Sequence, residues 1–373
     1  MKIAVLGAGN SGQTCSADLA LSGHEVNLFE LPEFKASIEP VIQRKGIQIL
    51  GNAKTGFARL NKVTMDMHEA IEGVDLILIT VPAFGHKYFI KACAPYLEDG
   101  QIVCLVPGTG GSLEFDKGLR SLGIKKDIML GETNTFVYGC RITGPAQVTV
   151  YRIFKEVLLA AFPAKNTEKL VGSMNKIYPS FVPGANVLET ALNNPNAVIH
   201  PIVTILNAGR IEYTKGNFLI YHEGVTASVA RVLEAVDRER LSVLKALNLD
   251  QVTFFERLFG RGSVPSGTIL EQFAHFSPVQ APSNLDRDRF IIEDIPYGLV
   301  PIASLGDMLD VSTPVIRSLI TLASTINQVN YMDEGRTVEK MGISKLHIDE
   351  LNKFLIDGSL GHKWRSTQGQ AQP

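Results

Sequence analysis

Among the eight histidines of this chain, His200 stands in the segment that most strongly suggests acid–base chemistry. It is followed by Pro201, at the point where the chain passes into its second half. Imidazole is the side chain best suited to donating and taking back a proton near neutral pH. Asn196 stands four residues earlier and would share a helical face with His200. Because a proline disfavours helical geometry at the residue before it, we expect one helix to end at His200 and another to begin at Pro201.

A second group of charged residues follows much later, in the sequence RFIIEDIP at Arg289–Pro296. Arg289 is of a type that can hold a carboxylate through two parallel hydrogen bonds, and Asp294 is of a type that can orient a histidine. The same pattern also fits a solvated loop beside an edge strand, and the residues alone leave both interpretations open. Tyr221 is a lesser candidate for a substrate pocket, and equally fits an ordinary helix start.

The loop after the first apolar strand reads GAGNSG at residues 7–12, which is the GxGxxG pattern. The first glycine allows a tight turn, the second lets a pyrophosphate approach the backbone, and the third lets the helix pack closely on the strand. The start of that helix offers unpaired N–H groups to the phosphates. The candidate cofactor-binding residues of this loop are Gly7, Gly9, Asn10, Ser11 and Gly12.

Glu30 ends the second predicted strand, where an acidic residue is expected to meet the adenosine ribose. A carboxylate accepts hydrogen bonds from a 2′-hydroxyl and repels a 2′-phosphate, and no arginine follows nearby. Glu30 therefore favours NAD(H) over NADP(H), with Lys35 as the one residue that argues the other way. Val81 and Pro82 end a later strand and either line the nicotinamide side of the site or form an ordinary strand exit.

The elements that must position these residues alternate between strand and helix through the first half of the chain. Strands, several of them apolar and rich in β-branched residues, are predicted at residues 1–6, 24–30, 74–81, 101–106 and 128–130, most of them followed by a helix. This pattern is typical of a parallel sheet covered on both faces. Residues 48–64 break the rhythm and are predicted to form a small hairpin inserted in the sheet.

Long helical patterns dominate the second half, at residues 198–211, 226–247 and 314–327, where apolar positions recur at three- and four-residue steps. The predicted fold class is therefore α/β, with an N-terminal doubly wound Rossmann-type domain and a mainly α-helical C-terminal domain. We place the dinucleotide-binding domain at residues 1–186, the helical substrate domain at 187–360 and a mobile tail at 361–373.

Composition and charge exclude several classes of function. The formal net charge is −2, which is not the basic excess of a nucleic-acid-binding protein. No apolar run is long enough to span a membrane, and the first residues do not have the pattern of a signal peptide. The four cysteines form no CxxC pair, which argues against a metal site and for free thiols in the reducing cytoplasm.

The chain resembles the opine dehydrogenases over residues 1–357, a family that includes octopine dehydrogenase and the bacterial N-(carboxyalkyl) amino acid dehydrogenases. The segments that carry the resemblance are GAGNSG (7–12), VPAFGH (81–86), GETNTFVYGCR (131–141), NPNAVIHP (194–201), FLIYHEGVT (218–226), RFIIEDIPYGLVP (289–301) and EGRTVEKMGI (334–343). The His-Pro segment and the Arg-x4-Asp segment together separate this family from dehydrogenases of related fold that use a catalytic lysine.

The resemblance implies a role for each matched residue. His200 matches the catalytic acid/base histidine, and Asp294 matches the aspartate that pairs with it. Arg289 matches an arginine suited to holding a substrate carboxylate, and Asn196 matches an active-site asparagine. The implied reaction joins an amine or amino acid to a 2-oxo acid such as pyruvate by NAD(H)-dependent reductive amination. The site is expected in the cleft between the two domains.

Other functions stay open at this point. A carbonyl reductase of ketopantoate type would reduce the 2-oxo acid itself and would need an essential lysine, for which no comparable motif is found. An imine reductase would accept preformed or cyclic imines, and a non-enzymatic NAD-sensing protein would keep the fold without the paired catalytic residues. Association into a homodimer through the helical domain is a further hypothesis.

Overall fold

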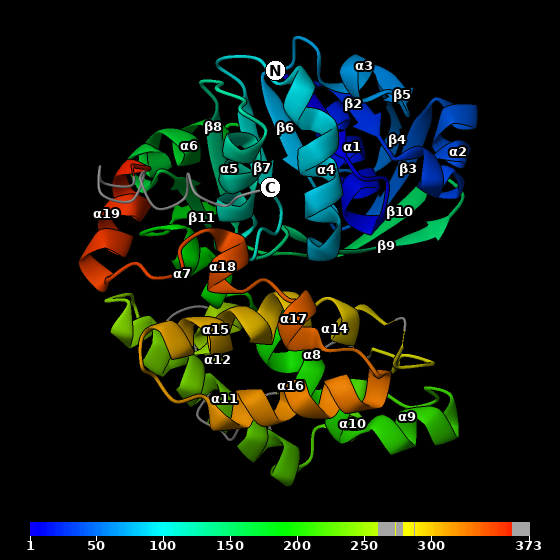
Figure 1. The fold of residues 1–373 in the computed structure, drawn as a ribbon. Helices are drawn as coiled ribbons and strands as arrows, with labels where there is room; N and C mark the ends of the chain where they lie inside the picture. The colour runs from blue at the N-terminus through cyan, green and yellow to red at the C-terminus, as the bar shows by residue number, and fades with distance from the viewer. Residues whose placement is uncertain (260–272, 274–278, 287, 360–373) are drawn as a thin grey trace. The chain divides into compact units, whose positions relative to one another are not determined.

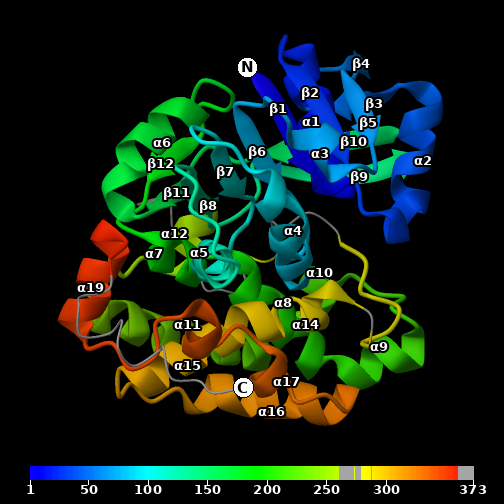
Figure 2. The ribbon, with the colours of Figure 1, turned by 45° about the horizontal axis from the view of Figure 1, so that its top comes forward.

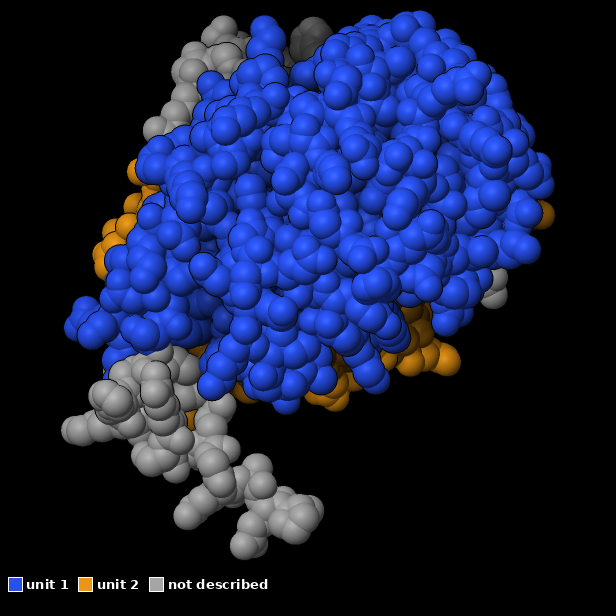
Figure 3. Space-filling view, turned by 90° about the horizontal axis from the view of Figure 1, so that it is seen from above, with its two compact units in different colours: residues 1–190, 349–373 blue, residues 191–348 orange. Residues whose placement is uncertain are grey.

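The computed structural model describes residues 1–259, 273, 279–286 and 288–359, and its contacts divide the chain into two units (Figure 3). Unit 1 comprises Met1–Thr190 and resumes at Asp349, and unit 2 comprises Ala191–Ile348. The predicted boundary after residue 186 lies slightly before this division. Residues 349–359 belong to unit 1, not to the helical domain in which we placed them. The predicted tail at 361–373 lies outside the described residues.

Unit 1 is built on an eight-stranded sheet with the order β12-β11-β8-β7-β6-β1-β2-β5 (Figures 1 and 2). Its strands are β1 (Lys2–Leu6), β2 (Glu25–Phe29), β5 (Lys62–Thr64), β6 (Leu76–Ile79), β7 (Ile102–Leu105), β8 (Met129–Thr133), β11 (Val157–Phe162) and β12 (Phe181–Pro183). Neighbouring strands pair in parallel except β8 with β11. Ile3 and Val5 face one buried cluster while Ala4 and Leu6 face another. β1 is therefore buried on both faces, as a central parallel strand requires.

Helices follow the strands of this sheet and cover it, with α4 and α5 side by side (Figure 1). The helices of unit 1 are α1 (Asn10–Leu21), α2 (Lys35–Arg44), α3 (Met67–Ile71), α4 (His86–Cys93), α5 (Gly111–Ser121), α6 (Thr167–Met174), α7 (Val187–Leu192) and α19 (Ile348–Asp357), of which α7 and α19 begin or end across the division. This is the predicted doubly wound arrangement.

The segment predicted as a hairpin in the main sheet is placed differently. β3 (Gly46–Gly51) and β4 (Gly56–Arg59) do form an antiparallel pair, but β3 also pairs with β10 (Gln147–Ile153), which pairs with β9 (Tyr138–Gly144). These strands make a separate four-stranded sheet that contacts α1. Of the strands in this segment, only β5 pairs within the main sheet. β3 is drawn into the second sheet because it pairs with β10, about a hundred residues further along the chain.

The described part of unit 2 consists of helices and one isolated β-bridge. The helices are α8 (Pro195–Leu206), α9 (Ala208–Thr214), α10 (Ile220–Gly224), α11 (Ala227–Ala246), α12 (Phe254–Phe259), α14 (Arg289–Ile292), the π-helix η5 (Ile295–Leu299), α15 (Val300–Met308), α16 (Pro314–Asn327), α17 (Tyr331–Glu334) and α18 (Val338–Met341). α8 lies among α10, α11, α12, α14, α16 and η5 (Figure 1). It is buried along most of its length, apart from Asn196, His200 and Leu206.

One local prediction for unit 2 is wrong, and one of the two interpretations left open for RFIIEDIP does not hold. α8 does not end at His200 but continues through Pro201. A proline removes one backbone N–H and crowds one carbonyl of the preceding turn, and burial of both flanks of α8 outweighs that cost. The apolar residues of RFIIEDIP form α14 and lead into η5, so they are helical and not an edge strand.

All four cysteines are buried and free, in agreement with the prediction of unpaired thiols. Burial raises the pKa of Cys15 and of Cys93 to about 12. Within the described ranges, no helix is long and apolar enough to cross a membrane. No group of acidic, cysteine or histidine side chains suited to a metal ion occurs in that same part of the chain.

Candidate active site

The glycine-rich loop between β1 and α1 has the geometry of a dinucleotide-binding turn. Gly7 has a φ of +105°, and a Cβ atom there would lie 2.4 Å from Val81 Cγ1. A Cβ on Gly12 would lie 1.7 Å from the carbonyl oxygen of Gly7, so only glycine lets α1 start so close to β1. Gly9 differs, because a Cβ there would meet no protein atom within 4 Å. The open space beside Gly9 is where a pyrophosphate would approach the backbone.

A cavity of about 530 Å³ opens beside this loop at the carboxyl ends of the parallel strands. Its walls include five of the predicted cofactor-binding residues, Gly7, Gly9, Glu30, Val81 and Pro82. Ligands of doubly wound folds bind at this end of the sheet, where the strand order reverses. The cavity therefore fits the adenosine half of a dinucleotide, and its further lining residues Phe34 and Tyr88 are exposed aromatic rings that sequence reasoning missed.

Glu30 is buried and held in place by the backbone. Its carboxylate accepts hydrogen bonds from the N–H of Ala8 at 2.7 Å and of Leu31 at 2.9 Å. Burial raises the pKa of Glu30 above its ordinary value, and these two hydrogen bonds oppose the rise. A carboxylate oxygen has a second lone pair, so Glu30 can still accept hydrogen bonds from ribose hydroxyls.

Asn10, Ser11 and Gly12 do not line the cavity. The side-chain oxygen of Asn10 accepts a hydrogen bond from the N–H of Ile142 at 2.7 Å, which ties α1 to β9. Ser11 lies in the first turn of α1, where backbone N–H groups lack helical partners. A role for these three residues in cofactor binding stays a prediction.

In unit 2, residues 94 positions apart come together around one imidazole. His200 Nδ1 lies 2.8 Å from Asp294 Oδ2, and the side chains are 13% and 4% exposed. Asp294 stands between α14 and η5, both of which contact α8. Since Nδ1 is engaged by the carboxylate, Nε2 is the nitrogen left for a substrate. A buried carboxylate on one nitrogen fixes the tautomer and stabilises the imidazolium form.

Two aromatic rings lie parallel to the imidazole of His200. The ring of Phe290 stacks on it with centroids 3.8 Å apart and an interplanar angle of 17°. The ring of Tyr221 lies at 6.5 Å and 19°. Phe290 was not among the predicted site residues, although it stands between the predicted Arg289 and Asp294. These rings restrict how the imidazole can turn and leave it little contact with water.

Arg289 begins α14 and forms an ion pair with Glu293, the residue that follows the end of this helix. Its Nε donates to Glu293 Oε2 at 2.9 Å, and its side chain is 48% exposed while that of Glu293 is 7% exposed. Although burial lowers the pKa of Arg289, the charges of Glu293 and Asp294 outweigh it, and the net shift is upward. The bond through Nε holds the guanidinium while its outer edge stays available for a carboxylate.

Asn196 lies one helical turn before His200 on α8, and both are partly accessible. Its backbone N–H donates to the side chain of Asn194, which caps the helix. The structure thus places Asp294 and Tyr221 beside the imidazole of His200, and Arg289 lies on α14, which ends just before Asp294. Asn196 shares the helical face of His200, and no hydrogen bond joins their side chains.

Comparison with known proteins separates the two halves of the chain. Residues 183–327 match the model of the α-helical domain of NAD/NADP octopine/nopaline dehydrogenases, and residues 3–120 match that of ketopantoate reductases. An opine dehydrogenase of Arthrobacter sp. (strain 1C) is 35% identical over 347 residues, which cover 92% of this chain and 95% of the relative. The chain belongs to the opine dehydrogenase family. The ocs protein of Agrobacterium tumefaciens (strain Ach5) is a more distant relative, 25% identical over 95% of this chain and 98% of its own.

Solved structures agree with this family fold. An octopine dehydrogenase in complex with NADH and agmatine matches with a TM-score of 0.75 at 19% identity, covering 97% of this chain and 99% of its own. A ketopantoate reductase from Ralstonia eutropha matches with a TM-score of 0.59 at 20% identity, covering 88% of this chain and 99% of its own. The predicted fold class and the predicted family resemblance are confirmed. As a member of the opine dehydrogenase family, the protein is an NAD-dependent oxidoreductase that acts on small molecules.

Proposed function

We propose that this protein joins a 2-oxo acid to an amine or amino acid, by reducing the imine that they form, with His200 as the proton donor and acceptor. The observation that carries the proposal is the 2.8 Å contact between His200 and the buried Asp294. A carbonyl reductase with a catalytic lysine would not need this pair. Structures of octopine dehydrogenase with pyruvate and with L-arginine support the same substrate classes for the present chain.

The reaction balances as a reductive condensation. The oxo acid and the amine lose water to give an imine, whose carbon accepts a hydride while its nitrogen takes a proton. The nicotinamide supplies the hydride when the cofactor is bound. In the direction of reduction, protonated His200 donates from Nε2, and in the reverse direction neutral His200 accepts the proton there. Asp294 keeps the ring oriented and favours its charged form.

The product identifies the reaction directly. We expect the protein, NADH, pyruvate and a panel of amino acids to yield a compound whose mass equals both substrates minus water plus two hydrogens. Mass spectrometry of the mixture measures this. A carbonyl reductase, which the match of residues 3–120 to ketopantoate reductases keeps as the alternative, would instead yield the 2-hydroxy acid with no amine present.

Arg289 is proposed to hold the carboxylate of the oxo acid. Replacing it with leucine removes a charge-assisted hydrogen-bonded pair worth about 1.5–3 kcal/mol, so the KM for the oxo acid should rise about 10- to 100-fold. Lysine should restore little, because it lacks the planar fork. Steady-state kinetics with varied pyruvate measure this. Arg210, which is 40% exposed and also paired with a glutamate, provides the control R210L, and an equal rise in both variants would contradict the role.

Glu30 is proposed to bind the adenosine ribose and to favour NAD(H). E30Q removes the negative charge and keeps the size of the side chain. One charged hydrogen bond is worth about 1.5 kcal/mol, so NADH should bind about tenfold more weakly. The ratio of the NADPH Kd to the NADH Kd should also become smaller, because no carboxylate repels the 2′-phosphate. Fluorescence titration measures both affinities. E33Q changes an exposed carboxylate on the same cavity and should have a smaller effect.

The raised pKa of Glu30 also predicts a pH dependence. Ribose hydroxyls donate to the ionised carboxylate, so NADH affinity should fall as acidification protonates Glu30. The fall should begin at a higher pH than for a solvent-exposed glutamate and should be absent in E30Q. An identical pH profile in the wild type and in E30Q would contradict the assignment.

We also propose that two copies associate through unit 2 and that the protein works in the cytoplasm. Two apolar side chains of α16, Leu322 and Ile326, are 48% and 40% exposed, which supports a helical contact surface. Sedimentation velocity that finds only monomer would rule out the dimer. The free, buried thiols support a reducing compartment.

A further inference from the structure

Arg240 is a buried cation that belongs to none of the residues assigned above. It lies on α11 and is 1% exposed. Its Nε donates to Asp237 Oδ1 at 2.8 Å, and Nη2 lies 2.7 Å from the same oxygen. A buried arginine with a carboxylate one turn away on its own helix is neutralised locally, so the charge itself needs no further partner.

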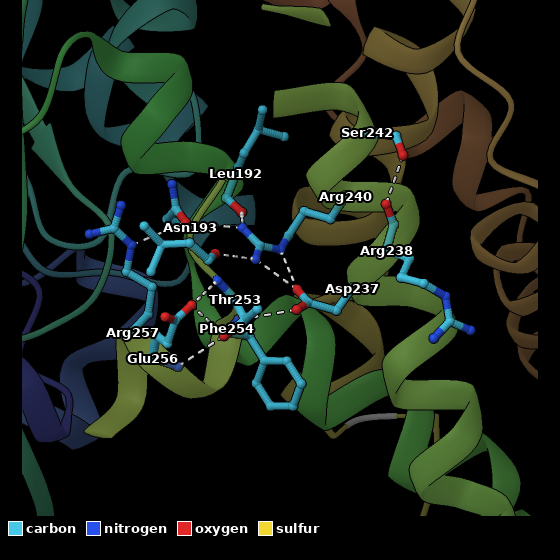
Figure 4. Close-up of polar contacts among 11 residues, drawn as sticks. Leu192, Asn193, Asp237, Arg238, Arg240, Ser242, Thr253, Phe254, Glu256 and Arg257 are labelled. Carbon is cyan, nitrogen blue, oxygen red and sulfur yellow. Dashed lines mark hydrogen bonds and ion pairs between the residues drawn. The ribbon is translucent and has the colours of Figure 1, made fainter. Parts of the chain in front are cut away.

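The remaining donors of Arg240 leave α11 and reach two other segments (Figure 4). Nη1 donates to the carbonyl oxygen of Leu192 at 3.2 Å and to Asn193 Oδ1 at 3.0 Å. Nη2 donates to the carbonyl oxygen of Val252 at 2.7 Å. The five N–H groups of the guanidinium thus have five acceptor contacts, a pattern that the three N–H groups of lysine cannot reproduce.

The first segment leads directly to the helix that carries His200. Leu192 and Asn193 immediately precede Asn194, whose side chain accepts from the N–H of Asn196 and caps α8. Arg240 therefore fixes the chain just before the helix start. Arg257 Nε donates a second hydrogen bond to the same Asn193 oxygen, at 3.3 Å.

The second segment reaches the same imidazole through aromatic rings. Asp237 Oδ2 accepts from the N–H of Phe254 at 3.2 Å, so the Arg240–Asp237 pair also holds the start of α12. The ring of the next residue, Phe255, lies edge-on to the ring of Phe273, with their centroids 5.8 Å apart. The ring centroid of Phe273 lies 6.1 Å from that of Tyr221, and the ring of Tyr221 is nearly parallel to the imidazole of His200.

We propose that Arg240 is a positioning residue for the reductive amination reaction, which sets the place of His200 through the start of α8 and through the ring contacts that end at Tyr221. It touches neither substrate nor cofactor and acts through His200. This inference rests on the proposed function. It predicts that the fork geometry of arginine is needed, and not the positive charge alone.

The test combines Arg240 variants with a variant of the histidine. R240K should lower kcat about 10- to 100-fold, the loss expected for a catalytic group misplaced by about 1 Å, while the Kd for NADH stays unchanged. In the H200Q background, R240K should lower the remaining rate less than twofold, because the group that it positions is already gone. R238M, on the same helix at a 69% exposed side chain, should match the wild type in both backgrounds.

If Arg240 only stabilised the fold, R240K would change kcat differently in the two backgrounds from the changes given above. If R240K lowers kcat by the same factor in the wild-type background and in the H200Q background, or does not lower it at all, Arg240 does not act through the histidine and the proposal is overturned. Should R240K fail to fold by circular dichroism, N193A gives the same test, because it removes the acceptor next to the α8 start and leaves the Arg240–Asp237 pair intact. If the wild type shows no amine-dependent turnover, the proposed function fails first, and this inference falls with it.

Discussion

Replacing His200 with glutamine should lower kcat/KM for the oxo acid about 10²- to 10⁴-fold, the usual contribution of a positioned general acid or base. Glutamine can fill the space beside Phe290, but it cannot give a proton to the imine nitrogen. The Kd for NADH should not change, because the residues that we assign to the cofactor belong to a different unit. Stopped-flow reduction with saturating NADH measures the chemical step itself.

His222 provides the matched control for this variant. It is an exposed histidine on α10, one residue after Tyr221, and H222Q should keep nearly the full rate. D294N should show an intermediate loss, because the ring keeps a hydrogen-bond partner but loses the charge that stabilises its protonated form. If H200Q retains wild-type kcat/KM, the proton donor must be sought elsewhere.

Placing alanine at Gly9 should abolish tight NADH binding without disturbing the fold. A Cβ at this position meets no protein atom within 4 Å, so the thermal midpoint of the free protein should stay the same. The methyl group would instead occupy the space of the pyrophosphate. Loss of two charge-assisted hydrogen bonds at about 1.5 kcal/mol each weakens binding roughly 100-fold. The stabilisation that NADH gives in a thermal shift assay should therefore disappear.

Gly12 separates this effect from a general intolerance of the loop. There a Cβ would lie 1.7 Å from the carbonyl oxygen of Gly7, so G12A must push α1 away from β1 and should lower the thermal midpoint even without cofactor. The contrast between the two variants is the informative result. NADH binding by G9A at wild-type affinity would contradict the placement of the pyrophosphate beside Gly9.

The dinucleotide-binding half was predictable because its signals are local. A strand, a glycine-rich turn, a helix and a second strand followed directly by Glu30 succeed one another within thirty residues, and the structure shows a steric reason for glycine at Gly7 and at Gly12. The second sheet was not predictable in the same way. β3 pairs with β10, which lies about a hundred residues later, and no local sequence pattern predicts this pairing.

In unit 2, the helices whose apolar residues recur at three- and four-residue steps were predicted well. The helix that contains a proline was predicted poorly, because burial outweighs the local effect of that proline. α16 (Pro314–Asn327) has the predicted bounds, and α11 differs by a single residue at each end. One helix was expected to end at His200 and another to begin at Pro201, yet α8 is buried on several sides and continues through both residues. The family resemblance identified His200 and Asp294 as a pair, although neither spacing nor periodicity could bring together residues 94 positions apart.

Contacts that depend on tertiary packing were out of reach of sequence reasoning. Phe290 stands inside a segment that was already of interest, but its stacking on His200 follows from the turn of α14 against α8. Arg240 is one of three arginines on α11, and its position in the sequence does not distinguish it from the other two. Only burial distinguishes it from Arg238, two residues away on the exposed face.

Reductive amination with His200 as the proton donor is tested by the rate of NADH oxidation at 340 nm with pyruvate, measured with and without a panel of amino acids. Oxidation should require both substrates and should collapse in H200Q, whereas H222Q should keep the wild-type rate. Equally fast oxidation with pyruvate alone, unaffected by any amine, would contradict reductive amination and establish a carbonyl reductase in its place.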